Sequence, residues 1–245
     1  MKKIILASAL GLCIAPMAHA DRLLGLFAGA GVWSTDYSGN AGDPSITLSD
    51  LGVKSNTNNF YYLALEHAVP LVPNVRLEHT SISNRESAMV TNTFTINGTS
   101  FNASEQVDSA FDLSHTDATF YYQLLDNWIQ FDLGLTARKF NGFVSATSPS
   151  ASERVSVDQT LPLVYAKAQF DLPFTGLSAG AEGNYVSLNK DKLTDYRVKV
   201  SYLFDSVIDL GVEAGYRTMK LTVDESDLTG KLDFKGSYVA LIAHF

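Results

Sequence analysis

Two histidine pairs have the residue types and the spacing that nucleophilic or acid–base chemistry requires. His79 and Ser81 lie two positions apart, so an extended strand would place a base and a hydroxyl nucleophile on one face. His115 and Asp117 have the same spacing, and a carboxylate beside a histidine can orient the imidazole as a general base. Such pairs are common by chance on strands, and strand parity directs His79 toward lipid. We therefore predict no catalytic residue and no enzymatic activity.

Three aspartates, Asp36, Asp43 and Asp50, lie in one polar segment and could supply carboxylate oxygens to a divalent cation. A solvated acidic loop is the simpler interpretation of this segment. The sequence contains no HExxH motif, no nucleotide-binding glycine loop and no zinc-ligand spacing. We therefore expect neither a metal nor a cofactor.

The N-terminal residues have the three parts of a cleavable secretory signal. Two lysines precede an apolar stretch over residues 4–15, and Ala-His-Ala at 18–20 is a small-x-small cleavage pattern. We expect residues 1–20 to be removed and residues 21–245 to form one domain. The single cysteine, Cys13, would leave with the signal, which suits an oxidising compartment.

The composition is acidic, with 18 Lys and Arg against 26 Asp and Glu and a formal net charge of −8. Nucleic-acid binding depends mainly on cationic side chains that neutralise phosphates, so we expect no nucleic-acid partner. After residue 21 no apolar run approaches the roughly 18 residues of a membrane helix. A mature chain that crosses a membrane would therefore have to do so as a closed barrel.

Apolar residues alternate with polar residues or glycine along many segments, which is the period of a half-buried strand. The clearest segment places Ile129, Phe131, Leu133, Leu135 and Ala137 on one face. A second, over residues 208–217, alternates in the same way. Strands of soluble sandwiches usually have about five or six residues, whereas these segments have the length of about nine or more that a tilted membrane strand needs.

The whole mature sequence can be divided into about ten such strands, with an error of about two. We place them near residues 23–35, 58–69, 74–84, 110–124, 128–140, 155–171, 177–188, 193–204, 207–221 and 231–245.

The connections between these strands alternate in length. Short connections are predicted at 70–73, 125–127, 173–176 and 205–206, and longer polar ones at 36–57, 85–109, 141–154 and 222–230, with the short 189–192 as an exception. Short periplasmic turns and long external loops are typical of transmembrane barrels. Within the longest loop, residues 93–104 resemble a hairpin because Asn97-Gly98 lies at their centre. We predict an all-β fold, namely a closed antiparallel up-and-down transmembrane barrel of about 10 strands, with 8–12 as the range.

Charged residues of both signs occupy the positions opposite the apolar stripes and should line the lumen. They are Glu66, Arg76, Glu78, Asp117, Asp132, Arg138, Lys167, Glu182, Arg197, Lys199, Asp209, Glu213 and Arg217. A barrel of about ten strands is only slightly wider than one that side chains can fill. Opposite charges in it should therefore pair and plug the lumen. A narrow pore is the alternative.

The last strand alternates as well, with Val239, Leu241 and Phe245 on one face. This pattern resembles the sorting signal of outer-membrane barrels, which the barrel assembly machinery recognises. We expect that machinery, periplasmic chaperones, outer-membrane lipids and lipopolysaccharide as partners.

Residues 61–78 read Tyr-Tyr-Leu-Ala-Leu-Glu-His-Ala-Val-Pro-Leu-Val-Pro-Asn-Val-Arg-Leu-Glu. This segment resembles the signature of a family of small outer-membrane β-barrel proteins of Gram-negative bacteria, which share Leu-Glu-His-Pro-Val-Pro-Leu-Leu-Pro-Asn before a strand with arginine and glutamate. The family's Asp-Leu-Gly segment is matched at residues 50–52, while Ala68 and Val72 replace its proline and leucine. The resemblance implies a barrel and its location, and it leaves the role open.

These observations predict an integral protein of the outer membrane of a Gram-negative bacterium. The preferred role is structural or surface-interacting, with a largely plugged polar lumen and with the exposed loops as the interacting part. A narrow porin-like channel for small solutes is one alternative. A lipid-modifying enzyme or protease of the outer membrane is the other.

Overall fold

The computed structural model describes residues 24–204, 208–224 and 229–245. The predicted signal peptide, residues 1–20, lies outside the described residues. Within the described ranges, no helix is long and apolar enough to cross a bilayer.

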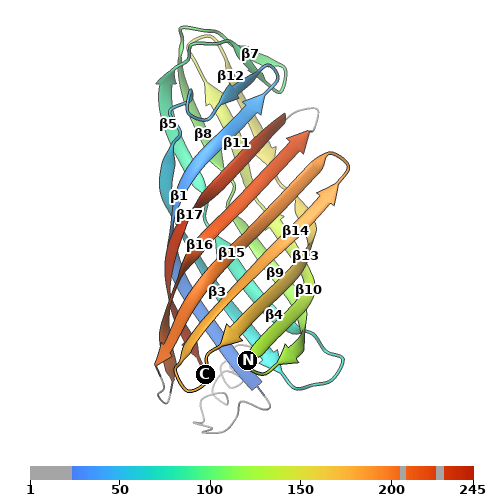
Figure 1. The fold of residues 1–245 in the computed structure, drawn as a ribbon. Helices are drawn as coiled ribbons and strands as arrows, with labels where there is room; N and C mark the ends of the chain where they lie inside the picture. The colour runs from blue at the N-terminus through green and yellow to red at the C-terminus, as the bar shows by residue number, and fades with distance from the viewer. Residues whose placement is uncertain (1–23, 205–207, 225–228) are drawn as a thin grey trace, which may run out of the picture.

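Ten strands of the described chain close into an antiparallel barrel, which confirms the predicted fold class and strand number. The strands are β1 (Leu24–Gly42), β3 (Ser55–His67), β4 (Asn74–Thr80), β9 (His115–Asp126), β10 (Ile129–Phe140), β13 (Thr160–Asp171), β14 (Leu177–Leu188), β15 (Asp191–Phe204), β16 (Asp209–Asp224) and β17 (Thr229–His244). Each pairs with its neighbour in this order, and β17 pairs with β1 to close the sheet. Figure 1 shows the strands strongly tilted around the barrel axis, as closure requires.

Short turns and both ends of the described chain, Leu24 and Phe245, lie together at the lower end of the barrel in Figure 1. The β13–β14 turn shows why its sequence suits a tight connection, because Gly176 has a φ of +72° and a Cβ there would lie 2.4 Å from the carbonyl oxygen of Leu203. Only glycine fits such a backbone position without strain. The short connections predicted at 70–73, 125–127 and 173–176 lie at this end of the barrel, and the one predicted at 205–206 falls outside the described residues.

Four of the barrel strands continue upward as a second sheet, which corrects part of the prediction. The additional strands are β5 (Ser83–Met89), β8 (Gln106–Asp112), β11 (Gly142–Thr147) and β12 (Ser152–Val157), in the order β12-β11-β8-β5. The chain also forms β2 (Ser45–Thr47) and the small hairpin of β6 (Phe94–Ile96) and β7 (Thr99–Phe101).

The segments 36–57, 85–109 and 141–154 were predicted as loops, yet much of each is strand. Above the barrel the outward side chains face water and are polar, so the composition resembles that of a loop. The inward positions still alternate as strand positions, since Val107 and Phe111 of β8 are buried. The predicted hairpin around Asn97-Gly98 is present as β6–β7.

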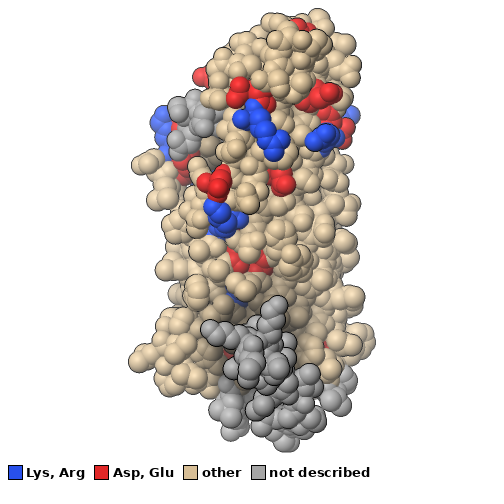
Figure 2. Space-filling model, turned by 180° about the vertical axis from the view of Figure 1, so that it is seen from behind, with Lys and Arg blue, Asp and Glu red and all other residues tan. Residues whose placement is uncertain are grey.

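A belt of apolar side chains covers the middle of the outer surface. Leu133 and Leu135 of β10 are 40% and 63% exposed, whereas the inward Asp132 and Arg138 of the same strand are 0% exposed. Exposed aromatic residues accompany the apolar belt: Tyr61, Tyr122, Trp128, Phe170, Tyr185, Tyr196, Phe204 and Tyr216. Figure 2 shows that charged side chains on the rear face gather mainly in the upper half of the molecule.

The interior has three levels from the upper end to the lower end. The upper level is an apolar core in which Trp33, Phe60, Leu193 and Phe234 are at most 2% exposed. The middle level is charged, and the lower level is a cavity. Strand parity predicted only the polar part of this interior, because the upper segments have the polar composition of loops.

Candidate functional site

The predicted lumen-lining charges occupy the middle and lower levels of the interior. Eight are buried, with at most 7% exposure: Glu78, Asp117, Asp132, Arg138, Glu182, Arg197, Glu213 and Arg217. Five are partly buried: Glu66, Arg76, Lys167, Lys199 and Asp209.

The upper group of ion pairs connects four strands, β9, β10, β15 and β16. Arg138 of β10 binds Asp117 of β9 through two hydrogen bonds, Nε to Oδ1 at 2.8 Å and Nη2 to Oδ2 at 2.6 Å. Its Nη2 also donates to Oδ2 of Asp195 on β15 at 2.7 Å. Arg217 of β16 binds the same Asp195 through Nε at 2.9 Å and Nη2 at 2.7 Å. Asp195 is therefore shared by two arginines.

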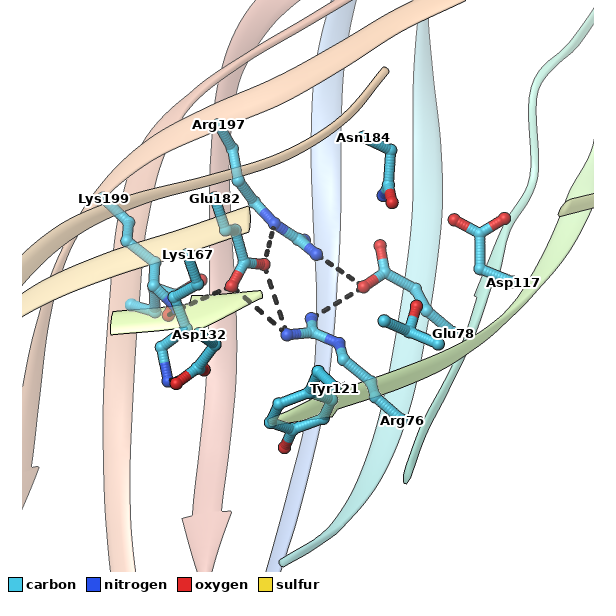
Figure 3. Close-up of polar contacts among 12 residues, drawn as sticks. Arg76, Glu78, Asp117, Tyr121, Asp132, Lys167, Glu182, Asn184, Arg197 and Lys199 are labelled. Atoms are coloured by element: carbon cyan, nitrogen blue, oxygen red, sulfur yellow. Dashed lines mark hydrogen bonds and ion pairs between the residues drawn. The ribbon is translucent and has the colours of Figure 1, made fainter. Parts of the chain in front are cut away.

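The lower group connects β4, β14 and β15, as Figure 3 shows. Arg76 contacts Glu78 at 2.7 Å and Glu182 at 3.2 Å. Arg197 contacts the same two carboxylates, with Nε 2.6 Å from Glu182. Arg217 lies 3.5 Å from Glu78 and so joins the two groups.

Lys199 extends the connected set toward the last strand. Its Nζ lies 3.0 Å from Glu213 and 3.6 Å from Glu182. The hydroxyl of Tyr238 donates to Glu213 at 2.8 Å. We call the connected set the charge network; it comprises Arg76, Glu78, Asp117, Arg138, Glu182, Asp195, Arg197, Lys199, Glu213 and Arg217.

Aromatic rings hold several of the guanidinium groups in place. The guanidinium carbon of Arg76 lies 4.1 Å from the ring centre of Tyr62, and that of Arg217 lies 5.0 Å from the ring of Trp33. Arginine stacks well on aromatic faces while its fork binds carboxylates. The network has equal numbers of acids and bases, so it neutralises itself. A largely buried, ion-paired set of this kind acts as a polar core and does not by itself indicate catalysis.

Asp195 was missing from the predicted lumen-lining set, although it connects the two arginines of the upper group. It has the same strand parity as Arg197, which was included. Parity alone could therefore have found it.

Neither histidine pair is arranged as a catalytic pair. His115 is 2% exposed and its Nδ1 lies 3.0 Å from the carbonyl oxygen of Leu113. Both carboxylate oxygens of Asp117 are bound by Arg138 instead. His79 lies on the outer face, where its Nδ1 is 3.0 Å from the Thr116 hydroxyl.

The three aspartates of the first polar segment do not form one cluster. Asp36 lies on β1 opposite Lys235, and Asp50 accepts a hydrogen bond of 2.7 Å from Thr47. Among the residues that the structure describes, no group of three or more His, Cys, Asp or Glu could hold a metal ion.

A cavity of about 900 Å³ lies below the charge network, and we call it the vestibule. Its wall includes Glu66, Tyr121, Asp132 and Lys167, and it reaches Phe174 in the lower β13–β14 turn. Glu66 accepts hydrogen bonds from the Tyr121 hydroxyl at 2.7 Å and from Gln123 at 3.0 Å. The lower part of the lumen is therefore open and polar.

The predicted assembly-signal residues lie at the seam between the first and last strands. Val239 and Leu241 are 57% and 71% exposed on the apolar belt. The backbone of Phe245 exchanges two hydrogen bonds with Leu26, at 2.9 and 3.2 Å. These contacts extend the β1–β17 pairing to the lower rim.

No protein-family model matches the chain, and no curated protein matches it in sequence. The family resemblance at residues 61–78 therefore stays a prediction. Three solved structures have a similar fold. The outer membrane protease OmpT of Escherichia coli has 8% identity and a TM-score of 0.44, covering 91% of this chain and 95% of its own. The transport unit of the Escherichia coli autotransporter AIDA-I has 8% identity and a TM-score of 0.42, covering 98% and 95%. A Pseudomonas aeruginosa FadL homologue has 10% identity and a TM-score of 0.37, covering 91% and 90%.

The structure itself defines the class of protein. Outer-membrane barrels share three features with this structure. They have a closed antiparallel sheet with an even number of strands, an apolar outer belt with aromatic residues, and short turns at one end. The chain has the fold of an outer-membrane β-barrel protein with a buried, ion-paired interior. The comparisons assign no family and no activity.

Proposed function

We propose that the protein is an integral outer-membrane barrel of a Gram-negative bacterium, with a structural or surface-interacting role and a closed lumen. Its lower end, with the short turns, faces the periplasm, and its upper end faces the cell exterior. Outer-membrane lipids and lipopolysaccharide surround the apolar belt, and the barrel assembly machinery and periplasmic chaperones deliver the chain.

The proposal rests on one observation: the charge network and the apolar core fill the interior of the barrel at two successive levels. The charge network joins side chains from β4, β9, β10, β14, β15 and β16, and the apolar core lies above it. A solute would have to break buried ion pairs and then cross a layer of packed apolar side chains. Both steps are costly, so the arrangement favours a closed barrel over the alternative of a narrow channel.

The upper end is the part that we assign to interaction. Its β6–β7 hairpin is anchored, because Asn97 and Thr99 donate to Glu153 of β12 at 2.9 and 2.8 Å. Phe94 and Phe101 of the hairpin are 0% exposed and stack at 4.9 Å. A shaped and ordered polar surface outside the membrane suits recognition better than transport does. The paired Asp117 and the buried His115 support the further proposal that the protein is not an enzyme.

Conductance across planar lipid bilayers tests the closed lumen. Protein whose folding is verified by heat-modifiable gel mobility should give no stable current steps at neutral pH, while a general porin inserted under the same conditions gives them. Reproducible steps from the folded protein would favour the narrow channel. A detergent-only injection serves as the baseline.

A further inference from the structure

The vestibule contains a buried carboxylate that no described residue hydrogen-bonds. Asp132 is 0% exposed, and neither of its Oδ atoms has a hydrogen-bond partner among the described residues. The nearest cation is Lys167, with Nζ 3.5 Å from Oδ2, and this amine donates at 3.0 Å to Gln130 instead. An under-coordinated buried carboxylate is costly. A cost of this kind marks a position where a further cation would be stabilised.

The rest of the vestibule wall strengthens the preference for a positive ligand. The wall acids that do not belong to the charge network are Glu66, Asp126, Asp132 and Asp171, whereas Lys167 is the one such lysine or arginine among the described wall residues. A concave wall with an excess of one charge sign between low-dielectric sides concentrates ions of the opposite sign. The vestibule should therefore attract cations from the periplasm.

The size and the aromatic lining of the vestibule indicate an organic cation. Its volume of about 900 Å³ is within the range of small-molecule sites, and the rings of Phe27, Tyr62, Tyr121 and Tyr165 form part of the wall. Aromatic faces attract ammonium groups and also pack against methylene groups. The described residues offer no cluster of three metal ligands, which argues against a bare metal ion as the occupant.

We propose that the periplasmic vestibule binds a small aliphatic ammonium ion, with Asp132 as its principal counter-ion and Glu66 and the tyrosine rings as secondary contacts. This site is independent of the role of the upper end. Lys167 already holds an ammonium group near Asp132, so it competes with the ligand for the same carboxylate.

Isothermal titration calorimetry with 1,4-diaminobutane tests the proposal. The protein is folded in a maltoside detergent, since a phosphocholine headgroup would itself present a quaternary ammonium. The diamine should bind, whereas 1,4-butanediol, its uncharged analogue, should not. Asp132→Asn should weaken binding by about tenfold or more. Asp158→Asn, the same change in the exposed Lys139–Asp158 pair, should leave it unchanged.

Lys167→Met gives a second and opposite readout. Loss of the competing amine should strengthen diamine binding by roughly threefold or more. This variant retains Asp132 and so also decides the question if Asp132→Asn fails to fold. Absence of diamine binding to the wild type, equal binding by Asp132→Asn, weaker binding by Lys167→Met, or binding of Mg²⁺ in place of the diamine would each overturn the proposal.

Discussion

Arg138 and Asp195 meet inside the barrel through a hydrogen bond of 2.7 Å from Nη2 to Oδ2. Their strands, β10 and β15, are separated in the sheet by β13 and β14. The contact therefore passes through the lumen and not along the wall. Because Asp195 also binds Arg217, one carboxylate connects three strands that do not all touch one another.

Asp195→Asn should strongly destabilise the barrel. The substitution keeps the side-chain size but leaves two buried guanidinium groups with less compensating charge, and loss of one partner from a buried pair typically costs about 3–5 kcal/mol. The free energy of unfolding can be measured by urea titration of protein in lipid vesicles. The control Asp158→Asn removes an exposed partner and should change it by about 1 kcal/mol or less. A similarly small change for Asp195→Asn would mean that the network adds little stability.

Leu133→Arg should be costly because Leu133 lies on the apolar belt of β10. An arginine facing lipid costs about 2–4 kcal/mol near the bilayer midplane and less near the interfaces. Thr160→Arg is the matched control, since Thr160 is outward-facing and pairs with Lys139 toward the upper end of the same strand pair. Urea titration in vesicles compares the two variants. Equal stability of both would show that Leu133 does not face acyl chains.

Epitope tags should distinguish the two ends of the barrel. A tag inserted between Asn97 and Gly98 should be bound by antibody on intact cells, because this turn lies in the upper hairpin and a Cβ on Gly98 would meet no atom within 4 Å. A tag in the lower turn at residues 70–73, where Leu71 is 93% exposed, should be bound only after the outer membrane is permeabilised. The reverse result would invert the proposed orientation.

The β6–β7 hairpin should loosen in acid. Hydrogen bonds from Asn97 and Thr99 lower the pKa of Glu153 below its ordinary value. A carboxyl whose pKa is depressed in the folded state contributes stability above the unfolded-state pKa and loses it as the pH falls through the folded-state pKa. Hydrogen exchange of residues 94–101 should therefore accelerate in that acidic range.

Glu153→Gln provides the comparison for this acid response. The variant cannot titrate, so its exchange, corrected for intrinsic rates, should depend less on pH than that of the wild type. Glu105→Gln tests whether the effect is local, since Glu105 is hydrogen-bonded to Ser150 in the neighbouring segment. An identical acid response in wild type and Glu153→Gln would exclude Glu153 as its source.

The sequence predicted the barrel wall well because lipid imposes a strict alternation. On β10, Leu133 and Asp132 face opposite sides, as the period of two requires. Above the belt, water surrounds the outer face, so strands such as β8 lack outward apolar residues and resembled loops. The prediction of loops failed there because a polar composition does not require an irregular backbone.

Strand parity predicted which charged residues face the lumen, but it could not predict which of them form ion pairs with one another. It tells on which side of the sheet a residue lies, while partners depend on strand tilt and on the height of each residue in the barrel. Arg217 donates to Thr80, which is 137 positions away, and no local pattern encodes that contact. The lack of a hydrogen bond from any described residue to Asp132 was hidden for the same reason.

The β1–β17 seam makes barrel closure a late and optically visible event in folding. Trp33 donates from its indole to the carbonyl oxygen of Gly236, a separation of 203 positions, and is 0% exposed. Contacts of such long range form slowly because a large loop must close first. Trp128, the other tryptophan, is 65% exposed on the outside. With Trp128 replaced by phenylalanine, the emission of Trp33 would report the moment at which the first and last strands of the sheet meet.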